Sequence, residues 1–504
     1  MKNALKVLVA LLAVLVVLAA CEPEKETKTV IQPYEVGDDY GNGFTVSYVD
    51  SLGGVLADRV LDLDDNGSDD LVQVIVAGRF GTDLTLTKDH DTYTTLDQYY
   101  VLSGPVFIGN DNANNCELTI EAGTLIKGIK SDVSPGALII TRGSTINAVG
   151  TPAEPIIMTS SQPVGERAAG DWGGLIINGN APINDGDENG EAEGEGGSGT
   201  YGGSNAADNS GTLQYVSVRF AGTLFTASDE LNGIAFQGVG NGTTVDYIHV
   251  HRNADDGIEF FGGTVNVKHC VITGVLDDSF DWTSGWSGTA QFVVLQQYDV
   301  SAEASDDPRV IEADNKEGNV DATPRSNPTL ANFTVVGAGL DETVMLRRGT
   351  SITFLNSVVM SRDSSGDEDA DQILEEYHSS GASVLPVYAG VILSSANVNA
   401  LDSTVADTEV NYVATAAEEG WLQYVGSAGN VVNTSIYASF PATLFADSAT
   451  QEDGVTAVPT SAIAGTDIST YVAANTALTA TTYAGAIEAG GTDWTSGWVE
   501  TPAN

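Results

Sequence analysis

The chain has little positive charge. Only 20 of its 504 residues are Lys or Arg, against 69 Asp or Glu, so the formal net charge is -49. A surface this acidic repels a phosphate backbone, which excludes nucleic acid as a partner. It suits either life in high salt or the binding of cations, and both explanations stay open at this point.

Cysteine is scarce. Only Cys21, Cys116 and Cys270 are present. Cys116 and Cys270 lie far apart in the sequence, in what look like separate structural units, so we expect two buried free thiols. A disulfide between them is the alternative, because an oxidising compartment would allow it.

Several familiar catalytic signatures are missing. We find no Ser-His-Asp signature, P-loop or dinucleotide-binding loop, and the glycines of residues 238–242 are typical of a turn between strands. Beyond the first 20 residues, no stretch is long and apolar enough to predict a membrane span.

The N-terminus predicts an export signal. Lys2 and Lys6 precede an apolar run from Leu8 to Leu18, and small residues then lead to Cys21. This order is typical of a secretory signal over residues 1–20.

The position of Cys21 resembles a bacterial lipobox, although an ordinary signal peptide with a chance cysteine is the alternative. The resemblance implies cleavage before Cys21 and attachment of lipid to its thiol and its new amino group. Glu22 rather than Asp follows, which in such lipoproteins implies sorting to the outer membrane, facing either the periplasm or the outside. Several acyl chains hold a protein firmly to a bilayer, and polar residues 21–42 are predicted to form a tether.

A repeat organises the middle of the chain. Asp255-Asp256 recurs 22 residues later as Asp277-Asp278, and each pair is followed by a short alternating strand. A repeat of about 20 residues indicates a solenoid. It leaves too little room for a crossover helix, so we predict an all-β fold, a parallel β-helix.

Composition divides the chain into segments. We expect an N-terminal segment over 43–84 and the β-helix over 85–372. An acidic, glycine-rich insertion at 185–212 interrupts the helix and is predicted to be either disordered or ion-binding, with disorder favoured. Residues 373–504 are predicted to form the last coils and a cap on the end of the solenoid, because an open end exposes unpaired strand edges.

One acidic loop in the N-terminal segment has the spacing of a calcium site. Its oxygen-bearing residues alternate around Gly67, and an apolar strand rather than a helix follows. A β-hairpin calcium loop is therefore predicted, with a solvated acidic turn as the alternative. Its candidate ligands are Asp62, Asp64, Asn66, Ser68 and Asp70.

The repeated strands predict a row of carboxylates. If their apolar residues point inward, Glu259 and Asp281 point outward on adjacent coils about 4.8 Å apart. Glu312 extends the row, and the preceding turns add Asp255, Asp256, Asp277 and Asp278. Like charges this close need a cation, a raised pKa or exposure to water. Calcium, which prefers oxygen ligands, is the predicted cofactor.

Six segments carry a family resemblance across about residues 85–500: LTIEAGTLIKG at 118–128, WGGLIINGNAPIN at 172–184, and further segments at 201–222, 253–267, 346–350 and 493–498. They are similar to a group of secreted or lipid-anchored surface proteins of Gram-negative bacteria, many of them marine. The resemblance implies a right-handed parallel β-helix and a location on the cell surface. It implies no settled activity.

The predicted acidic face also resembles that of pectate-lyase-like enzymes. There, calcium on a β-helix grips an acidic sugar and a nearby Arg or Lys acts as the base, for which Lys268, Arg309 and Arg347 are candidates. Glycoside hydrolases of this fold use paired carboxylates instead, here Glu259 with Asp281 or Asp277 with Asp278. A solvated acidic ladder without function is the third interpretation.

Three histidines raise a further possibility. His249 and His251 alternate on one strand and His269 follows on the next coil, so zinc is conceivable. Histidines in a polar stack are the favoured interpretation.

We therefore expect a lipid-anchored outer-membrane protein. It would bind a polysaccharide or another surface through a calcium-stabilised β-helix without turning it over, since the sides of solenoids form long binding faces. The alternatives are a polysaccharide lyase or glycoside hydrolase acting at Glu259 and Asp281, and a structural coat protein.

Overall fold

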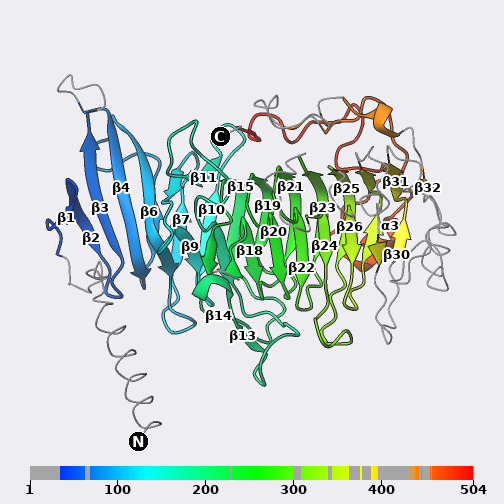
Figure 1. Ribbon diagram of the computed structural model, residues 1–504, viewed down its shortest axis with the longest axis horizontal. Coiled ribbons are helices and arrows are strands. Elements are labelled where there is room, and N and C mark those ends of the chain that lie inside the picture. The colour runs from blue at the N-terminus through cyan, green and yellow to red at the C-terminus, as the bar shows by residue number, and fades with distance from the viewer. Residues whose placement is uncertain are drawn as a thin grey trace, which may run out of the picture.

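The structure, a computed structural model, is built almost entirely of β-strands that stack along one axis (Figure 1). It forms one 28-stranded sheet and two small hairpins. The description covers residues 35–62, 69–226, 229–298, 308–338, 343–361, 375–376, 387–395, 431–432, 436–441, 444, 455 and 457–502.

The first strands close the N-terminal end. β1 (Asp39–Gly41), β2 (Phe44–Val49), β3 (Val55–Leu61) and β4 (Leu71–Phe80) pair antiparallel in that order. β4 then pairs in parallel with β6 (Asp97–Ile108), and every later step of the large sheet is parallel. These antiparallel strands therefore cover the first coil, and their apolar residues form a small core of their own.

The later strands form three parallel ladders, which we call A, B and C. Ladder A contains the first halves of the long strands together with β5 (Leu84–Leu86), β7 (Glu117–Ile120), β10 (Thr145–Val149), β27 (Thr353–Leu355) and β30 (Val387–Ala389). The long strands are β15 (Gly211–Arg219), β19 (Thr244–His251), β21 (Asn266–Thr273), β23 (Thr289–Gln296) and β25 (Thr329–Gly337).

Ladder B continues from the second halves of those long strands. Its other members are the first parts of β4 and β6 with β8 (Leu125–Gly128), β11 (Ile156–Ser160), β28 (Val358–Ser361), β31 (Ile392–Ser395) and β32 (Val431–Val432). Ladder C contains the ends of β4 and β6 with β9 (Ala137–Ile140), β12 (Leu175–Asn178), β18 (Ile234–Gln237), β20 (Ile258–Phe261), β22 (Phe280–Thr283), β24 (Ile311–Ala313), β26 (Val344–Leu346) and β29 (Glu375–Glu376). A chain that winds repeatedly through three parallel ladders is a parallel β-helix, as predicted.

A single bent residue joins ladder A to ladder B in each of the long strands. Its φ is positive, for example 58° at Tyr247 and 48° at His269. The bend brings these rings into a stack, with 4.5 Å between the centroids of Tyr247 and His269. In later coils Asn332 takes this place with a φ of 55°, and asparagine tolerates that conformation well.

Alternate residues of each strand fill the inside of the coils. Ile258, Phe260, Phe280 and Trp282 are fully buried there. Phe260 stacks on Trp286 with 4.0 Å between ring centroids. The predicted inward and outward alternation is therefore confirmed for β20 and β22.

The acidic insertion has a defined structure, which corrects the prediction of disorder. β13 (Glu191–Glu193) and β14 (Thr200–Gly202) form a hairpin, with a 3-10 turn η1 (Glu195–Gly197) between them. The buried guanidinium of Arg142 holds both strands, at 2.9 Å from Glu191 and 3.0 Å from the carbonyl of Gly202.

The C-terminal residues lie along the side of the helix. Residues 457–502, here called the C-terminal strap, contain α3 (Ser469–Ala474) and run back over ladders A and B (Figure 1). Asn332 donates a hydrogen bond to the carbonyl of Tyr483 (3.0 Å), and Trp498 packs edge-on against Tyr215. The prediction had placed this segment as a cap on the end of the solenoid.

The remaining fold predictions concern the thiols and the membrane. Cys116 and Cys270 are both buried and free, as expected. No helix within the described residues has the length and apolar character to cross a bilayer.

Candidate functional site: an acidic row and a groove on ladder C

The outer side of ladder C carries the predicted row of carboxylates. Glu259 lies opposite Asp281, and Asp281 lies opposite Glu312 in the parallel register. The three acids lie on β20, β22 and β24. Their side chains point outward, because the residues on either side of each acid point into the core. The row ends at Ala235 on one side and Met345 on the other.

The acids of the turns lie beside this row, as predicted. One oxygen each of Asp256, Glu259 and Asp281 lie within 4.8 Å of one another. The same holds for Asp278, Asp281 and Glu312. Asp281 belongs to both groups and is therefore the centre of the cluster.

Burial controls the protonation of these acids. It raises the pKa of Asp256, Glu259, Asp278 and Asp281 well above the ordinary range, and neighbouring carboxylates raise it further. Each group must therefore bind a proton or a cation at neutral pH to avoid a buried, uncompensated charge.

The half of the row that contains Asp256, Glu259 and Asp281 fits a cation. Asp281 is only 9% exposed, and its Oδ1 atom has no hydrogen-bond partner among the described residues. An orphaned buried carboxylate oxygen is costly unless an ion or a proton satisfies it. Oxygen ligands of this kind are those that calcium prefers.

Arginine neutralises the other half. Glu312 accepts from Arg309 at 2.8 Å and also from Arg347. Arg347 reaches Asp314 as well, at 2.9 Å, and Arg348 forms a further ion pair with Asp314. Burial nevertheless raises the pKa of Asp314 to about 6, against the lowering effect of Arg348.

The structure adds two residues that sequence reasoning missed. The buried side chain of Asn232 donates to Glu259 (2.7 Å) and to Glu195 of the insertion (3.0 Å). Glu195 lies 64 residues from Glu259 in a segment without repeat character, so no local pattern could have paired them.

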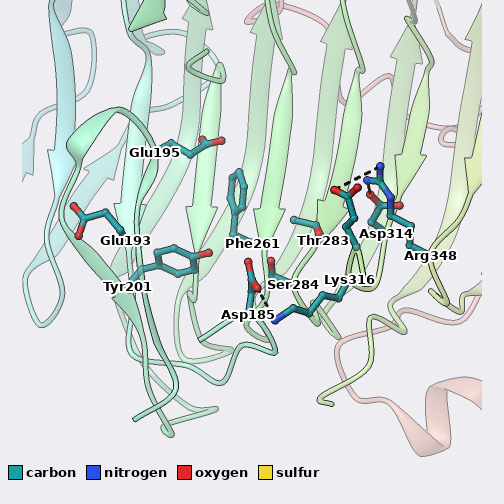
Figure 2. A pocket seen from close by; sticks show the side chains of 11 residues that line it. Asp185, Glu193, Glu195, Tyr201, Phe261, Thr283, Ser284, Asp314, Lys316 and Arg348 are labelled. Atoms are coloured by element: carbon teal, nitrogen blue, oxygen red, sulfur yellow. Dashed lines mark hydrogen bonds and ion pairs between the residues drawn. The ribbon is translucent and has the colours of Figure 1, made fainter. Parts of the chain in front are cut away.

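A groove continues from the acidic row along the same face. It encloses about 360 Å³ between the insertion and the strands of ladder C. Figure 2 shows Tyr201 of the insertion and Phe261 of ladder C lining it, together with the ion pair of Asp185 with Lys316. That pair measures 2.6 Å, and the two rings lie 6.3 Å apart. Aromatic, acidic and basic side chains along an open groove are suited to a polar, extended ligand.

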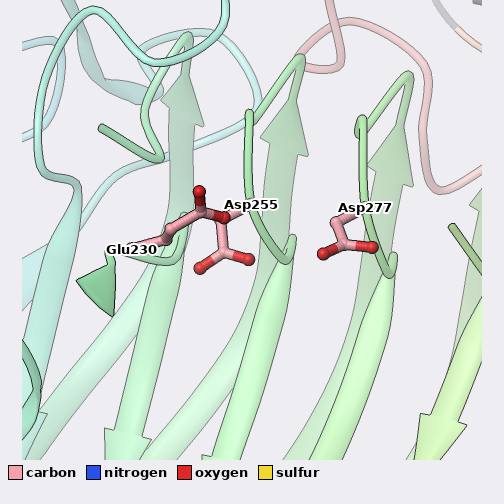
Figure 3. Close-up of side chains that lie close together, drawn as sticks. All are labelled: Glu230, Asp255 and Asp277. Carbon is pink, nitrogen blue, oxygen red and sulfur yellow. The ribbon is translucent and has the colours of Figure 1, made fainter. Parts of the chain in front are cut away.

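A third acidic group lies in the turns. Glu230, at the end of β17 (Asp229–Glu230), approaches Asp255 and Asp277 (Figure 3), with one oxygen of each within 4.8 Å of the others. Asp277 also comes near Asp256 and Asp278. Glu230 is exposed, so water can solvate this group and it requires no ion.

Some predicted site residues lie elsewhere. Lys268 lies on ladder A, where it donates to Thr479 of the C-terminal strap (3.2 Å), so its proposed role as a base at the acidic row is wrong. His249 and His251 lie under the strap, and His251 bonds Thr273 and the carbonyl of Pro502. His269 bonds Asp246 at 2.7 Å within the ring stack. No histidine belongs to a group able to hold a metal within the described ranges.

Two predictions fall on residues outside the description. Asp64, Asn66 and Ser68 of the calcium-like loop lie there, as does Cys21. Asp62 and Asp70 flank the loop at the ends of the antiparallel strands β3 and β4. The loop therefore connects a β-hairpin, and its calcium site stays a prediction.

The geometry defines a class of protein: a parallel β-helix that carries a row of acids and a groove on the outer face of one ladder. The comparison with protein families then identifies the family within this class. A family described as pectate-lyase like beta helix domain matches residues 85–438, so the chain belongs to that family. No curated protein and no solved structure matches the chain.

Proposed function

We propose that the protein is a lipid-anchored surface protein that binds calcium on ladder C and, with it, an acidic polysaccharide. The orphaned Oδ1 atom of buried Asp281, between two groups of carboxylates, carries this proposal. A bound cation satisfies that oxygen and leaves coordination positions for the carboxylates of a sugar chain.

The same geometry favours binding over turnover. Arg309 and Arg347 both form ion pairs with Glu312 at the end of the row. A guanidinium held by carboxylates is a poor base, because losing its proton would break those pairs. Membership of a pectate-lyase-like family supports a polysaccharide as the ligand and does not by itself assign catalysis.

A polysaccharide lyase or glycoside hydrolase is the second candidate. Glu259 and Asp281 are adjacent in register, and burial raises the pKa of both carboxyls. A protonated acid beside a second carboxylate is the arrangement that glycosidases use.

Calorimetry of the purified protein tests the proposal. Calcium should bind the wild type, and Asp281→Asn should weaken binding by about 100-fold, since changes to outer-shell groups alone cost 10–100-fold in metal affinity. Asp91→Asn, an exposed acid between β5 and β6, is the control and should bind normally. Equal calcium binding by wild type and Asp281→Asn would reject the site.

A panel of acidic polysaccharides then separates binding from catalysis. Calcium-dependent binding without product supports the first proposal. New ultraviolet absorption from unsaturated sugars, or new reducing ends, abolished by Asp281→Asn, would instead establish an enzyme. Membrane fractionation of a Cys21→Ser variant tests the anchor: release from the membrane is expected, and retention would argue against lipid on Cys21.

A further inference from the structure

The acidic insertion is fixed against the outer face of ladder C. The amide of Asn178 donates to the carbonyl of Ser198 (3.1 Å), and the hydroxyl of Ser198 lies 3.3 Å from the amide oxygen of Gln237. Gly196 packs on Leu231 so closely that an added Cβ would lie 2.5 Å from a methyl carbon of Leu231. Its φ of 56° also favours glycine. These contacts hold the neighbouring Glu195 over the acidic row.

Asn232 connects Glu195 to that row. It is fully buried, and its single amide nitrogen donates to Glu195 at 3.0 Å and to Glu259 at 2.7 Å. The two carboxylates therefore lie on either side of one nitrogen atom. The amide oxygen of Asn232 has no partner among the described residues, although it is buried.

We propose that the insertion covers one side of the cation site, with Glu195 adding a ligand to a calcium ion's oxygen shell begun by Asp256, Glu259 and Asp281. This inference rests on the proposed function. Calcium takes six to eight oxygen ligands, more than one ladder of short side chains supplies without waters. Glu195 adds a carboxylate, and a half-turn of the Asn232 amide directs its orphaned oxygen toward the ion.

The arrangement couples the ion to the groove. The same hairpin supplies Glu193 and Tyr201 to the wall of the groove. Without a cation, the carboxylates of Glu195 and Glu259 lie on either side of the Asn232 amide, and like charges held this close repel each other. With a cation, both carboxylates are attracted to one centre, so calcium draws the hairpin onto ladder C and fixes the groove for a ligand.

Glu195→Gln tests this coupling because glutamine keeps an acceptor for Asn232 and removes only the charge. Glu188→Gln, an exposed residue of the same insertion that does not line the groove, is the matched control. Two quantities are measured on the full chain: calcium affinity by calorimetry, and hydrogen exchange of residues 191–202 with calcium or with EDTA. Circular dichroism and thermal melting confirm that both variants fold.

The expected result is a calcium affinity about tenfold weaker in Glu195→Gln, with the calcium-dependent protection of residues 191–202 lost. Glu188→Gln should match the wild type in both. Wild-type calcium affinity in Glu195→Gln, or hairpin exchange that ignores calcium, would overturn the inference while leaving the site at Asp281 intact. If the wild type binds no calcium, the proposed function itself fails.

Discussion

The two halves of the acidic row differ in how their buried negative charge is compensated. At one end, Arg309 and Arg347 neutralise Glu312 from within the chain. At the other end, no arginine forms an ion pair with Asp256, Glu259 or Asp281 among the described residues, and Glu259 bonds the neutral amide of Asn232. Burial and Asp314 raise the pKa of Asp281 more than the charge of Arg347 lowers it, so the net shift is upward. The charge of Glu312 is compensated within the folded chain, which makes its end the first half, whereas the second half, Asp256, Glu259 and Asp281, needs a cation or protons from solution.

Along ladder C, the half with arginines therefore has a structural role and the half without them is the candidate binding site. A neutralised buried ion pair contributes to folding with or without a ligand, and losing one partner is strongly destabilising. An uncompensated cluster of carboxylates weakens the fold until a cation or protons bind. The comparison therefore predicts opposite responses of the two halves to the same changes.

The largest effect should come from removing the arginines. In Arg309→Met with Arg347→Met, Glu312 loses both cationic partners while staying buried. We expect a loss of about 3–5 kcal/mol in the free energy of unfolding in EDTA, measured by urea denaturation. Calcium should restore part of this loss, because the first half then also lacks an internal cation.

Lys88→Met provides the control for that variant. It removes an ion pair with Glu154 in which both side chains are about half exposed, and exposed pairs of this kind contribute little to stability. An equal loss in both variants, or a loss that calcium does not change, would contradict the comparison.

Calcium and pH should affect stability next most strongly. The raised pKa values of Glu259 and Asp281 mean that the folded protein binds more protons than the unfolded chain. Stability in EDTA should therefore be highest at low pH and fall as the pH rises through the raised pKa values. Asp314, whose pKa rises from 3.8 to about 6, adds a fall between about pH 4 and 6.

Calcium should reverse this trend at neutral pH. At 100 times its dissociation constant, it should add about 2.7 kcal/mol at pH 7.5 and far less at pH 4.5, where protons occupy the carboxylates. Thermal melting over this pH range, with calcium or EDTA, measures both effects. Stability in EDTA that increases from pH 5 to pH 8 would show that the unpaired half is already compensated.

The smallest predicted effect is that two Glu→Gln variants change the free energy of unfolding in opposite directions. Glu259→Gln keeps an acceptor for Asn232 and removes a repelling charge, so it should stabilise the calcium-free protein by about 1 kcal/mol. Glu312→Gln removes the partner of two arginines and should cost about 2 kcal/mol. Urea denaturation in EDTA compares them, and changes of equal sign would show that the two halves do not differ.

Periodicity predicted the fold and the row because both depend on local pattern. The step between Asp255-Asp256 and Asp277-Asp278 places Glu259 opposite Asp281, and the parallel register confirms it. The same reasoning extended correctly to Glu312, although residues outside the description intervene.

Periodicity did not identify the ladder on which a residue lies. A coil of three ladders has three outer faces, and alternation distinguishes only inside from outside. Lys268 points outward, yet it lies on ladder A and contacts the C-terminal strap. Glu195 and Asn232 were missed for a related reason: they meet through an insertion whose contacts are long-range and follow no repeat.

The C-terminal strap has a consequence for biosynthesis. Its docking surface is a line of outward apolar residues, including Val271, Val294, Val336 and Val358, supplied by successive coils. That surface is complete only after each coil has been wound in the correct order. A chain translated only as far as residue 456 would display this apolar seam to chaperones and proteases, so the final segment can dock only on a solenoid that has been wound without error.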